Sequence, residues 1–145
     1  MTKTMQELLA IGIKAEIEAI EAYTKLSENV TSLLLSERFE TLAKDEARHK
    51  KILEELHEEN FPGVPIILPE KSGVPKVQTT LTADNTISEI LSLAMQAEKL
   101  AEDYYHDLAT KVDSSEKKDL MNYLANIESG HYYFLKIEQE MLLGK

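Results

Sequence analysis

Apolar residues recur along this chain in four long stretches, with the three- and four-residue spacing of amphipathic helices. The predicted helices cover residues 4–29, 32–60, 86–112 and 114–143. Two of them open with a capping box, Thr4 with Glu7 and Thr86 with Glu89, in which each side chain satisfies a backbone amide at the start of the helix. The segment 61–85 carries all four prolines, which disfavour helix, so it predicts a connection without helical structure.

The lengths of the connections predict how these helices pair. The links near 29–32 and 112–115 are short, as in antiparallel helix hairpins, whereas 61–85 is long enough to cross the length of a bundle. The sequence therefore predicts an all-α fold, a four-helix bundle made of two helix hairpins joined by a long crossover. Its 145 residues, 43% of them hydrophobic and 29% charged, are typical of a single globular domain spanning 1–145.

The amino-acid composition excludes several kinds of site and partner. The chain has no cysteine, which excludes disulfides, cysteine-ligated zinc and iron–sulfur clusters. A formal net charge of -10 without a basic patch argues against nucleic-acid binding. The N-terminus has no apolar signal-peptide region and no apolar run is long enough to span a membrane, so we expect a cytoplasmic protein without membrane partners.

Charged side chains interrupt the apolar stripes of the helices at matching places in the two halves of the chain. Four residues of the first half return 82 positions later, as the pairs Glu16 and Glu98, Tyr23 and Tyr105, Glu46 and Glu128, His49 and His131. The two halves therefore form an internal repeat. A Glu and a His three residues apart lie on one helix face, close enough to bind one metal ion or two adjacent ions.

Burial of these side chains would require metal. Ionised carboxylates inside a protein are costly without a partner, and four of them converging would repel one another. Two divalent cations balance four carboxylates, and two neutral histidines complete the ligand set. The predicted metal ligands are Glu16, Glu46, His49, Glu98, Glu128 and His131. Any one of these glutamates alone would be read as a solvated side chain, but the agreement of both halves favours a dinuclear site.

The pattern resembles the ferritin-like di-iron carboxylate proteins, and within them the rubrerythrin-like branch, which use a Glu from each of two helices and a Glu-x-x-His from each of the other two. The resemblance implies two iron ions as cofactors. It also implies roles for the residues: Glu16 and Glu98 as terminal carboxylates, Glu46 and Glu128 as bridging carboxylates, His49 and His131 as nitrogen ligands. Manganese or mixed occupancy stays open, because the same ligands serve both metals.

The resemblance implies a dinuclear iron oxidoreductase that acts on dioxygen or hydrogen peroxide with Fe(II) as electron source, of ferroxidase or peroxidase type. No catalytic residue is predicted beyond the metal ligands, and the electron donor is unidentified. Rubrerythrins carry a further Glu one turn after the third-helix ligand and a rubredoxin-like domain, whereas this chain has Ala101 and no cysteine. Two other functions stay open: an iron-binding or iron-sequestering protein without significant turnover, and a purely structural bundle.

Three further residues are candidates for contacts with the ligands. Tyr23 and Tyr105 either bond a ligand on an antiparallel neighbour or simply pack in the core. Asp45 opens a segment that resembles the Asp-Glu-x-Arg-His form, in which the Asp orients a ligand His. The second half has Ile127 at that place, so this support would be one-sided.

The remaining side chains have plainer interpretations. His57 and His106 fall outside the apolar stripes near helix ends, which predicts solvated histidines. The apolar run from Val64 to Leu68, bounded by prolines, predicts a homodimer in which the run meets a second copy. The alternative is that the run lies across its own helices.

Overall fold

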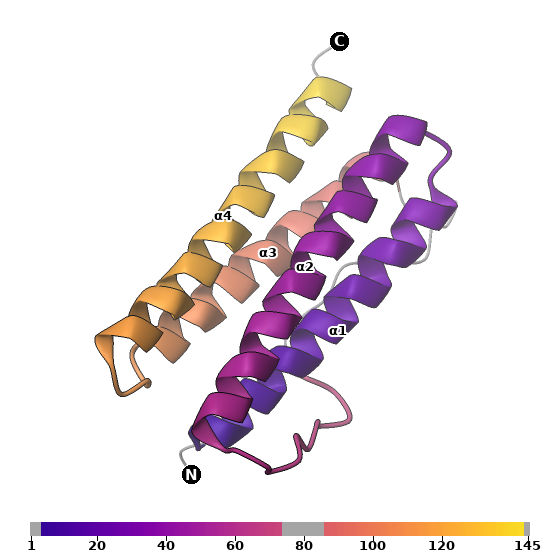
Figure 1. Cartoon of the computed structure of the whole chain (residues 1–145). Helices are drawn as coiled ribbons and strands as arrows, with labels where there is room; N and C mark the ends of the chain where they lie inside the picture. Colours follow the sequence, from indigo (N-terminus) through magenta and orange to yellow (C-terminus); the bar gives the residue numbers. More distant parts are fainter. Residues whose placement is uncertain (1–3, 74–85, 144–145) are drawn as a thin grey trace. The chain divides into compact units, whose positions relative to one another are not determined.

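The computed structural model describes residues 4–73 and 86–143. Within these ranges the chain forms four helices and no strand, so the all-α prediction is confirmed. The helices are α1 (Met5–Asn29), α2 (Leu33–Asn60), α3 (Ile87–Ala109) and α4 (Ser115–Leu143) (Figure 1).

Both predicted capping boxes are present with matching geometry. The hydroxyls of Thr4 and Thr86 accept hydrogen bonds of 3.1 Å from the amides of Glu7 and Glu89. In return, the carboxylates of these glutamates accept bonds of 2.8 Å from the two threonine amides. This reciprocal bonding fixes where α1 and α3 begin.

The end of α3 differs from the prediction, which was wrong in extending the helix to residue 112. The amides of Thr110 and Lys111 bond to carbonyls only three residues back, each at 3.0 Å, so the last turn tightens and the helix stops at Ala109. The Thr110 hydroxyl also donates to the carbonyl of Asp107 at 2.6 Å, a local bond that competes with further helix.

The chain divides into two compact units, Met1–Gly73 and Val74–Lys145, and each contains one helix hairpin. In the first, α1 and α2 run side by side in opposite directions, and in the second α3 and α4 do the same (Figure 1). Each hairpin has an apolar interior of fully buried side chains. They include Leu9, Ile13, Leu26, Phe39, Leu42 and Leu53 in the first unit and Ile90, Leu91, Leu108, Met121, Leu124 and Leu135 in the second.

After α2, the described part of the crossover turns back along α1. Its backbone turns at Gly63, whose φ of 75° is the left-handed conformation that glycine adopts without strain. Further on, Ser72 donates hydrogen bonds from its amide, at 3.1 Å, and from its hydroxyl to the carboxylate of Glu18 on α1. The segment is therefore fastened to its own hairpin.

The apolar run of this segment stays largely exposed despite the attachment. Val64 is 41% exposed, Ile67 79% and Leu68 39%. The rest of the predicted crossover, 74–85, lies outside the described residues. Among the helices that the structure describes, none combines the length and apolar character needed to cross a membrane.

Candidate metal centre

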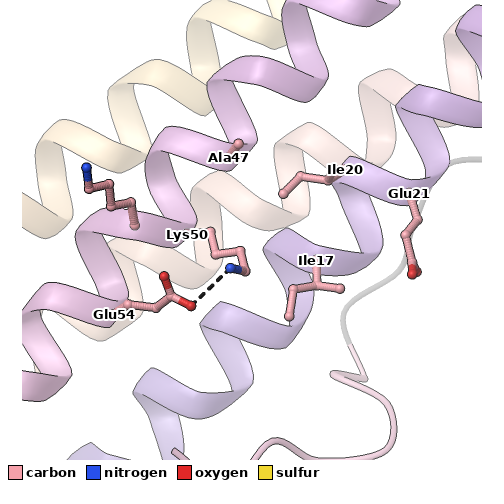
Figure 2. Close-up of a pocket in the computed structure, with 7 residues that line it drawn as sticks. Ile17, Ile20, Glu21, Ala47, Lys50 and Glu54 are labelled. Carbon is pink, nitrogen blue, oxygen red and sulfur yellow. Dashed lines mark hydrogen bonds and ion pairs between the residues drawn. The ribbon is translucent and has the colours of Figure 1, made fainter.

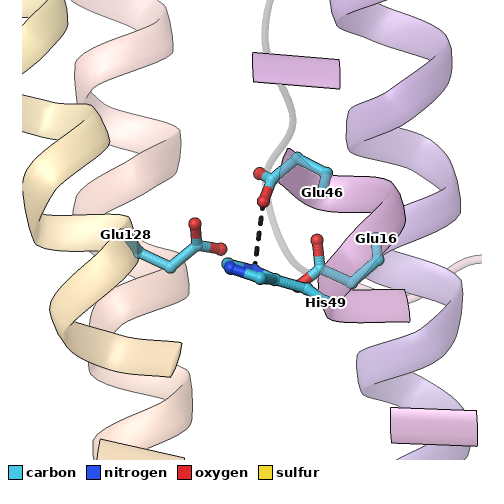
Figure 3. Close-up of side chains that lie close together, drawn as sticks. All are labelled: Glu16, Glu46, His49 and Glu128. Carbon is cyan, nitrogen blue, oxygen red and sulfur yellow. Dashed lines mark hydrogen bonds and ion pairs between the residues drawn. The ribbon is translucent and has the colours of Figure 1, made fainter. Parts of the chain in front are cut away.

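In the first unit, three predicted ligands converge on one point. Glu16 comes from α1, and Glu46 and His49 come from successive turns of α2. The Nδ1 atom of His49 lies 3.3 Å from Oε2 of Glu16 and 3.2 Å from Oε1 of Glu46. Figure 3 shows both carboxylates beside the imidazole, with a dashed line for the contact between Glu46 and His49.

The second unit repeats this arrangement with residues from α3 and α4. Nδ1 of His131 lies 3.3 Å from Oε2 of Glu98 and 3.2 Å from Oε1 of Glu128. The two distances equal those of the first unit. The sequence repeat is therefore also a repeat of local geometry, in which two carboxylates face one imidazole in each unit.

Each group of three has the composition and spacing of a metal-binding set. In each unit, ligand atoms of the three residues lie within 4.8 Å of one another. All six residues are buried: none is more than 6% exposed. Buried carboxylates need neutralisation, and two carboxylates with one imidazole are suitable ligands for iron, manganese or zinc. We call these sets the first triplet (Glu16, Glu46, His49) and the second triplet (Glu98, Glu128, His131).

The two tyrosines of the repeat are core residues. Tyr23 is 1% exposed and stacks on Phe39 with ring centroids 6.0 Å apart. Tyr105 is 2% exposed and meets Tyr104 edge to face at 5.7 Å. Core packing therefore accounts for both rings, and a contact between either hydroxyl and a metal ligand stays a prediction.

Asp45 faces the surface side of α2. Its carboxylate pairs with Arg48 one turn further on, and its side chain is 29% exposed. A role for Asp45 in orienting His49 stays a prediction.

The two remaining histidines differ from each other. His106 is exposed, as predicted, with Nδ1 3.2 Å from Oδ1 of Asn122. The prediction for His57 was wrong: it is only 1% exposed. It packs against Phe61, with ring centroids 5.3 Å apart, and borders α1 and the returning segment, which the helix periodicity of α2 alone could not reveal.

Tyr104 has no equivalent in the first unit, where Ala22 occupies its place in the repeat. Burial of its phenol disfavours the phenolate and raises its pKa well above the ordinary value of a tyrosine, and the neighbouring carboxylate of Asp107 raises this pKa further.

A hollow of about 540 Å³ between α1 and α2 has a different chemistry from the triplets (Figure 2). Its polar lining consists of lysines and glutamates without histidine, and Lys50 donates a hydrogen bond of 3.0 Å to Glu54 beside it. Ile17 and Ile20 form its apolar side. Lys50 and Glu54 pair with each other and the lining has no histidine, so the hollow is a poorer candidate for a metal centre than the triplets.

Glu18 is a buried charge that the sequence did not single out. It is 9% exposed and belongs to neither triplet, because Ser72 satisfies its carboxylate with two hydrogen bonds. Its partner comes from a segment without periodic pattern, 54 residues away, so no sequence signal could have paired them.

Comparisons with known proteins find relatives in sequence and in fold. The family model of rubrerythrin matches residues 7–138. A hypothetical protein from Pyrococcus furiosus is 38% identical, with a TM-score of 0.85 over 97% of this chain and 91% of its own. No curated protein matches the sequence.

Two more distant structures share the fold. A protein from Thermotoga maritima described as a ferritin-like diiron-carboxylate protein is 21% identical, with a TM-score of 0.73 over 95% of both chains. A manganese catalase from Anabaena is 16% identical, with a TM-score of 0.72 over all of this chain and 76% of its own. With the family model covering most of its length and two carboxylate–histidine triplets in place, the chain belongs to the rubrerythrin family.

Proposed function

We propose that this protein is a dinuclear iron oxidoreductase in which the two triplets together supply the ligands of two iron ions. It acts on dioxygen or hydrogen peroxide and draws electrons from Fe(II). The observation that carries the proposal is the repeated geometry, in which each buried histidine has two carboxylate oxygens at 3.2 and 3.3 Å.

The charge balance supports two divalent metal ions. Four carboxylates and two neutral imidazoles match the charge of two divalent ions, and carboxylate oxygen suits both Fe(II) and Fe(III). The family membership adds support, because the ligand pattern of a Glu from each of two helices and a Glu-x-x-His from each of the others is that of ferritin-like dinuclear proteins. Manganese would suit the same residues, as the fold shared with a manganese catalase illustrates.

When bound, the iron ions supply the electrons that reduce the oxidant. The protein contributes the rest. Glu46 with His49, and Glu128 with His131, present an oxygen and a nitrogen from one helix face, which positions both donors before metal arrives. Burial of the six side chains keeps bulk water from the reacting oxidant. Each histidine must be neutral at its coordinating nitrogen, so metal binding releases any proton held there.

Ala101 bears on which oxidant the site prefers. It lies one turn after Glu98 on α3. Rubrerythrins carry an additional Glu at the corresponding position. Without that carboxylate there is one proton carrier fewer beside the oxidant, so we expect slower turnover of peroxide than the full rubrerythrin pattern would give. We expect the electrons to come from a separate donor, because these 145 residues contain no cysteine that could hold a redox-active iron centre.

Stopped-flow oxidation tests the proposal. The anaerobic Fe(II)-loaded protein is mixed with dioxygen or with hydrogen peroxide, and formation of Fe(III) is followed by absorbance. We expect fast oxidation by at least one oxidant, and repeated turnover when Fe(II) is in excess. Iron that binds at two per chain but oxidises no faster than free Fe(II) would instead support iron sequestration without turnover.

A further inference from the structure

A cavity separate from both triplets lies at the beginning of α1. Its volume is about 440 Å³, within the range of small-molecule sites. Its wall combines the first turns of α1, the last turn of α2 and the returning segment after α2. The lining residues are Thr4, Gln6, Glu7, Ala10, Ile11, His57, Ile67, Leu68 and Pro69. We call it the His57 cavity.

His57 is the unusual member of this wall. The residue is 1% exposed, and among the described residues its Nε2 atom has no hydrogen-bond partner. A buried polar atom without a partner is costly, so such atoms in folded proteins are ordinarily satisfied by another group, a water or a ligand. His57 also lies eight residues beyond His49 on α2, or roughly 12 Å along the helix, so it is outside the first triplet.

The internal repeat provides the comparison that explains this unpaired atom. Gln139 occupies the place of His57 in the second unit, 82 residues further on. Its Nε2 donates two hydrogen bonds to α3, at 2.8 Å to the carbonyl of Ser88 and at 2.6 Å to the hydroxyl of Ser92. The counterpart of Ser92 in the first unit is Ala10, which has no hydroxyl. The second unit therefore contains the polar partner that the first unit lacks.

The lining restricts the chemistry of the missing partner. Ala10, Ile11 and the segment Ile67–Pro69 provide an apolar surface, so most of an occupant would be apolar. The carboxylate of Glu7 disfavours an anion, while the start of α1, with its positive end of the helix dipole, disfavours a cation. A neutral molecule fits both constraints.

We propose that the His57 cavity binds a small neutral molecule, mainly apolar, that carries one hydroxyl group. The hydroxyl bonds Nε2 of His57 and so takes the place that the Ser92 hydroxyl holds beside Gln139. The apolar part lies against Ile67 and Leu68, which are otherwise 79% and 39% exposed. This site is independent of the metal chemistry proposed above.

Calorimetric titration of the full-length protein tests this, with 4-methylphenol as probe and toluene as a matched molecule without the hydroxyl. We expect 4-methylphenol to bind roughly three to ten times more tightly, the range of one net hydrogen bond. A crystal soaked with the probe should show its oxygen within hydrogen-bond distance of His57. Equal affinities, or no binding of either probe, would overturn the proposal.

Two substitutions test whether the preference for 4-methylphenol arises at His57 or from unspecific binding elsewhere. Ala10→Ser introduces the hydroxyl that the repeat has at Ser92, which should satisfy His57 and abolish the preference for 4-methylphenol. Ser92→Ala makes the converse change in the other unit and should leave that preference intact. Both are small changes whose folding is checked by thermal unfolding. A preference that survives Ala10→Ser, or is lost in Ser92→Ala, would contradict a site at His57.

Discussion

The buried glutamates Glu16 and Glu18 have partners of two different kinds. Glu16 faces the imidazole of His49, whereas Glu18, two positions later on the same helix, accepts two hydrogen bonds from Ser72. Both are at most 9% exposed, so burial alone does not distinguish a candidate ligand from a structural carboxylate. The two residues differ in their partners: Glu16 faces a histidine and Glu18 a serine. Glu18 is therefore a matched control in tests of metal binding.

Replacement of Glu46 or Glu128, which we propose as bridging carboxylates, should remove both metal ions. The iron-loaded protein is expected to hold about two irons per chain, and Glu128→Ala or Glu46→Ala should lose both, because in the proposed site each of these carboxylates serves both ions. Metal analysis after gel filtration measures the content. Glu18→Gln is the control and should retain its iron. Full metal content in both alanine variants would place the metal site elsewhere.

Tyr104 should make stability fall at alkaline pH. Its pKa in the folded protein is raised by burial, whereas in the unfolded chain it is about 10. The unfolded state therefore loses this proton first, and the contribution to stability, complete below pH of about 10, declines as pH rises toward the folded pKa. Urea unfolding at neutral and alkaline pH, in wild type and Tyr104→Phe, measures it: the variant should lose less stability. Parallel losses would contradict the assignment.

For the helices, the sequence predicted those boundaries that depend on interactions between residues close together in the chain. Capping boxes at Thr4 and Thr86 located two helix starts to within one residue, since the cap and the helix period agree there. The end of α3 was missed, because the tightened turn at Thr110 depends on backbone bonds that carry no periodic signal. Burial of His57 was missed as well, since the neighbours that cover it are distant in sequence.

The bond between Ser72 and Glu18 should hold the returning segment against α1. Ser72→Ala removes the hydroxyl and leaves the buried carboxylate one partner short, which is expected to cost about 1–3 kcal/mol of unfolding free energy. Hydrogen exchange in 64–73 should accelerate in this variant, because local opening becomes easier. Lys71→Ala, an exposed neighbour, is the control. Unchanged exchange in Ser72→Ala would show that other contacts hold the segment.

For the whole molecule, the six candidate ligands were predictable because the same residues recur in both halves at the same helical positions. The sequence could not reveal that the two triplets would agree in their distances, since these depend on side-chain rotamers in the packed hairpins. Nor could it pair Glu18 with Ser72, because that contact joins a helix to a segment without pattern.

Metal removal should lower stability without unfolding the protein. A ligand that binds only the folded state stabilises it by about 2.7 kcal/mol when present at 100 times its dissociation constant. Chelation should therefore lower the unfolding temperature, and two equivalents of Fe(II) per chain, added anaerobically, should restore it. Differential scanning calorimetry measures both steps. An unfolding temperature indifferent to chelation would contradict metal binding at buried carboxylates.

The exposed run after α2 predicts self-association. Ile67 is 79% exposed and its neighbours Val64 and Leu68 about 40%, a patch that a second copy could cover around a two-fold axis. Light scattering should give twice the chain mass, and Ile67→Asp should halve it while leaving the metal content intact. A wild-type mass near 16.4 kDa at micromolar concentration would exclude the dimer.

The matched distances of the two triplets also have a statistical consequence. If each triplet bound one ion independently, the two sites would have equal intrinsic affinities, and the stepwise dissociation constants would differ by about fourfold from counting alone. Carboxylates shared between the ions would change that ratio, since the first ion would organise or compete for ligands of the second. A ratio well away from fourfold would therefore show that the two ions are coupled, as the proposed sharing of Glu46 and Glu128 requires.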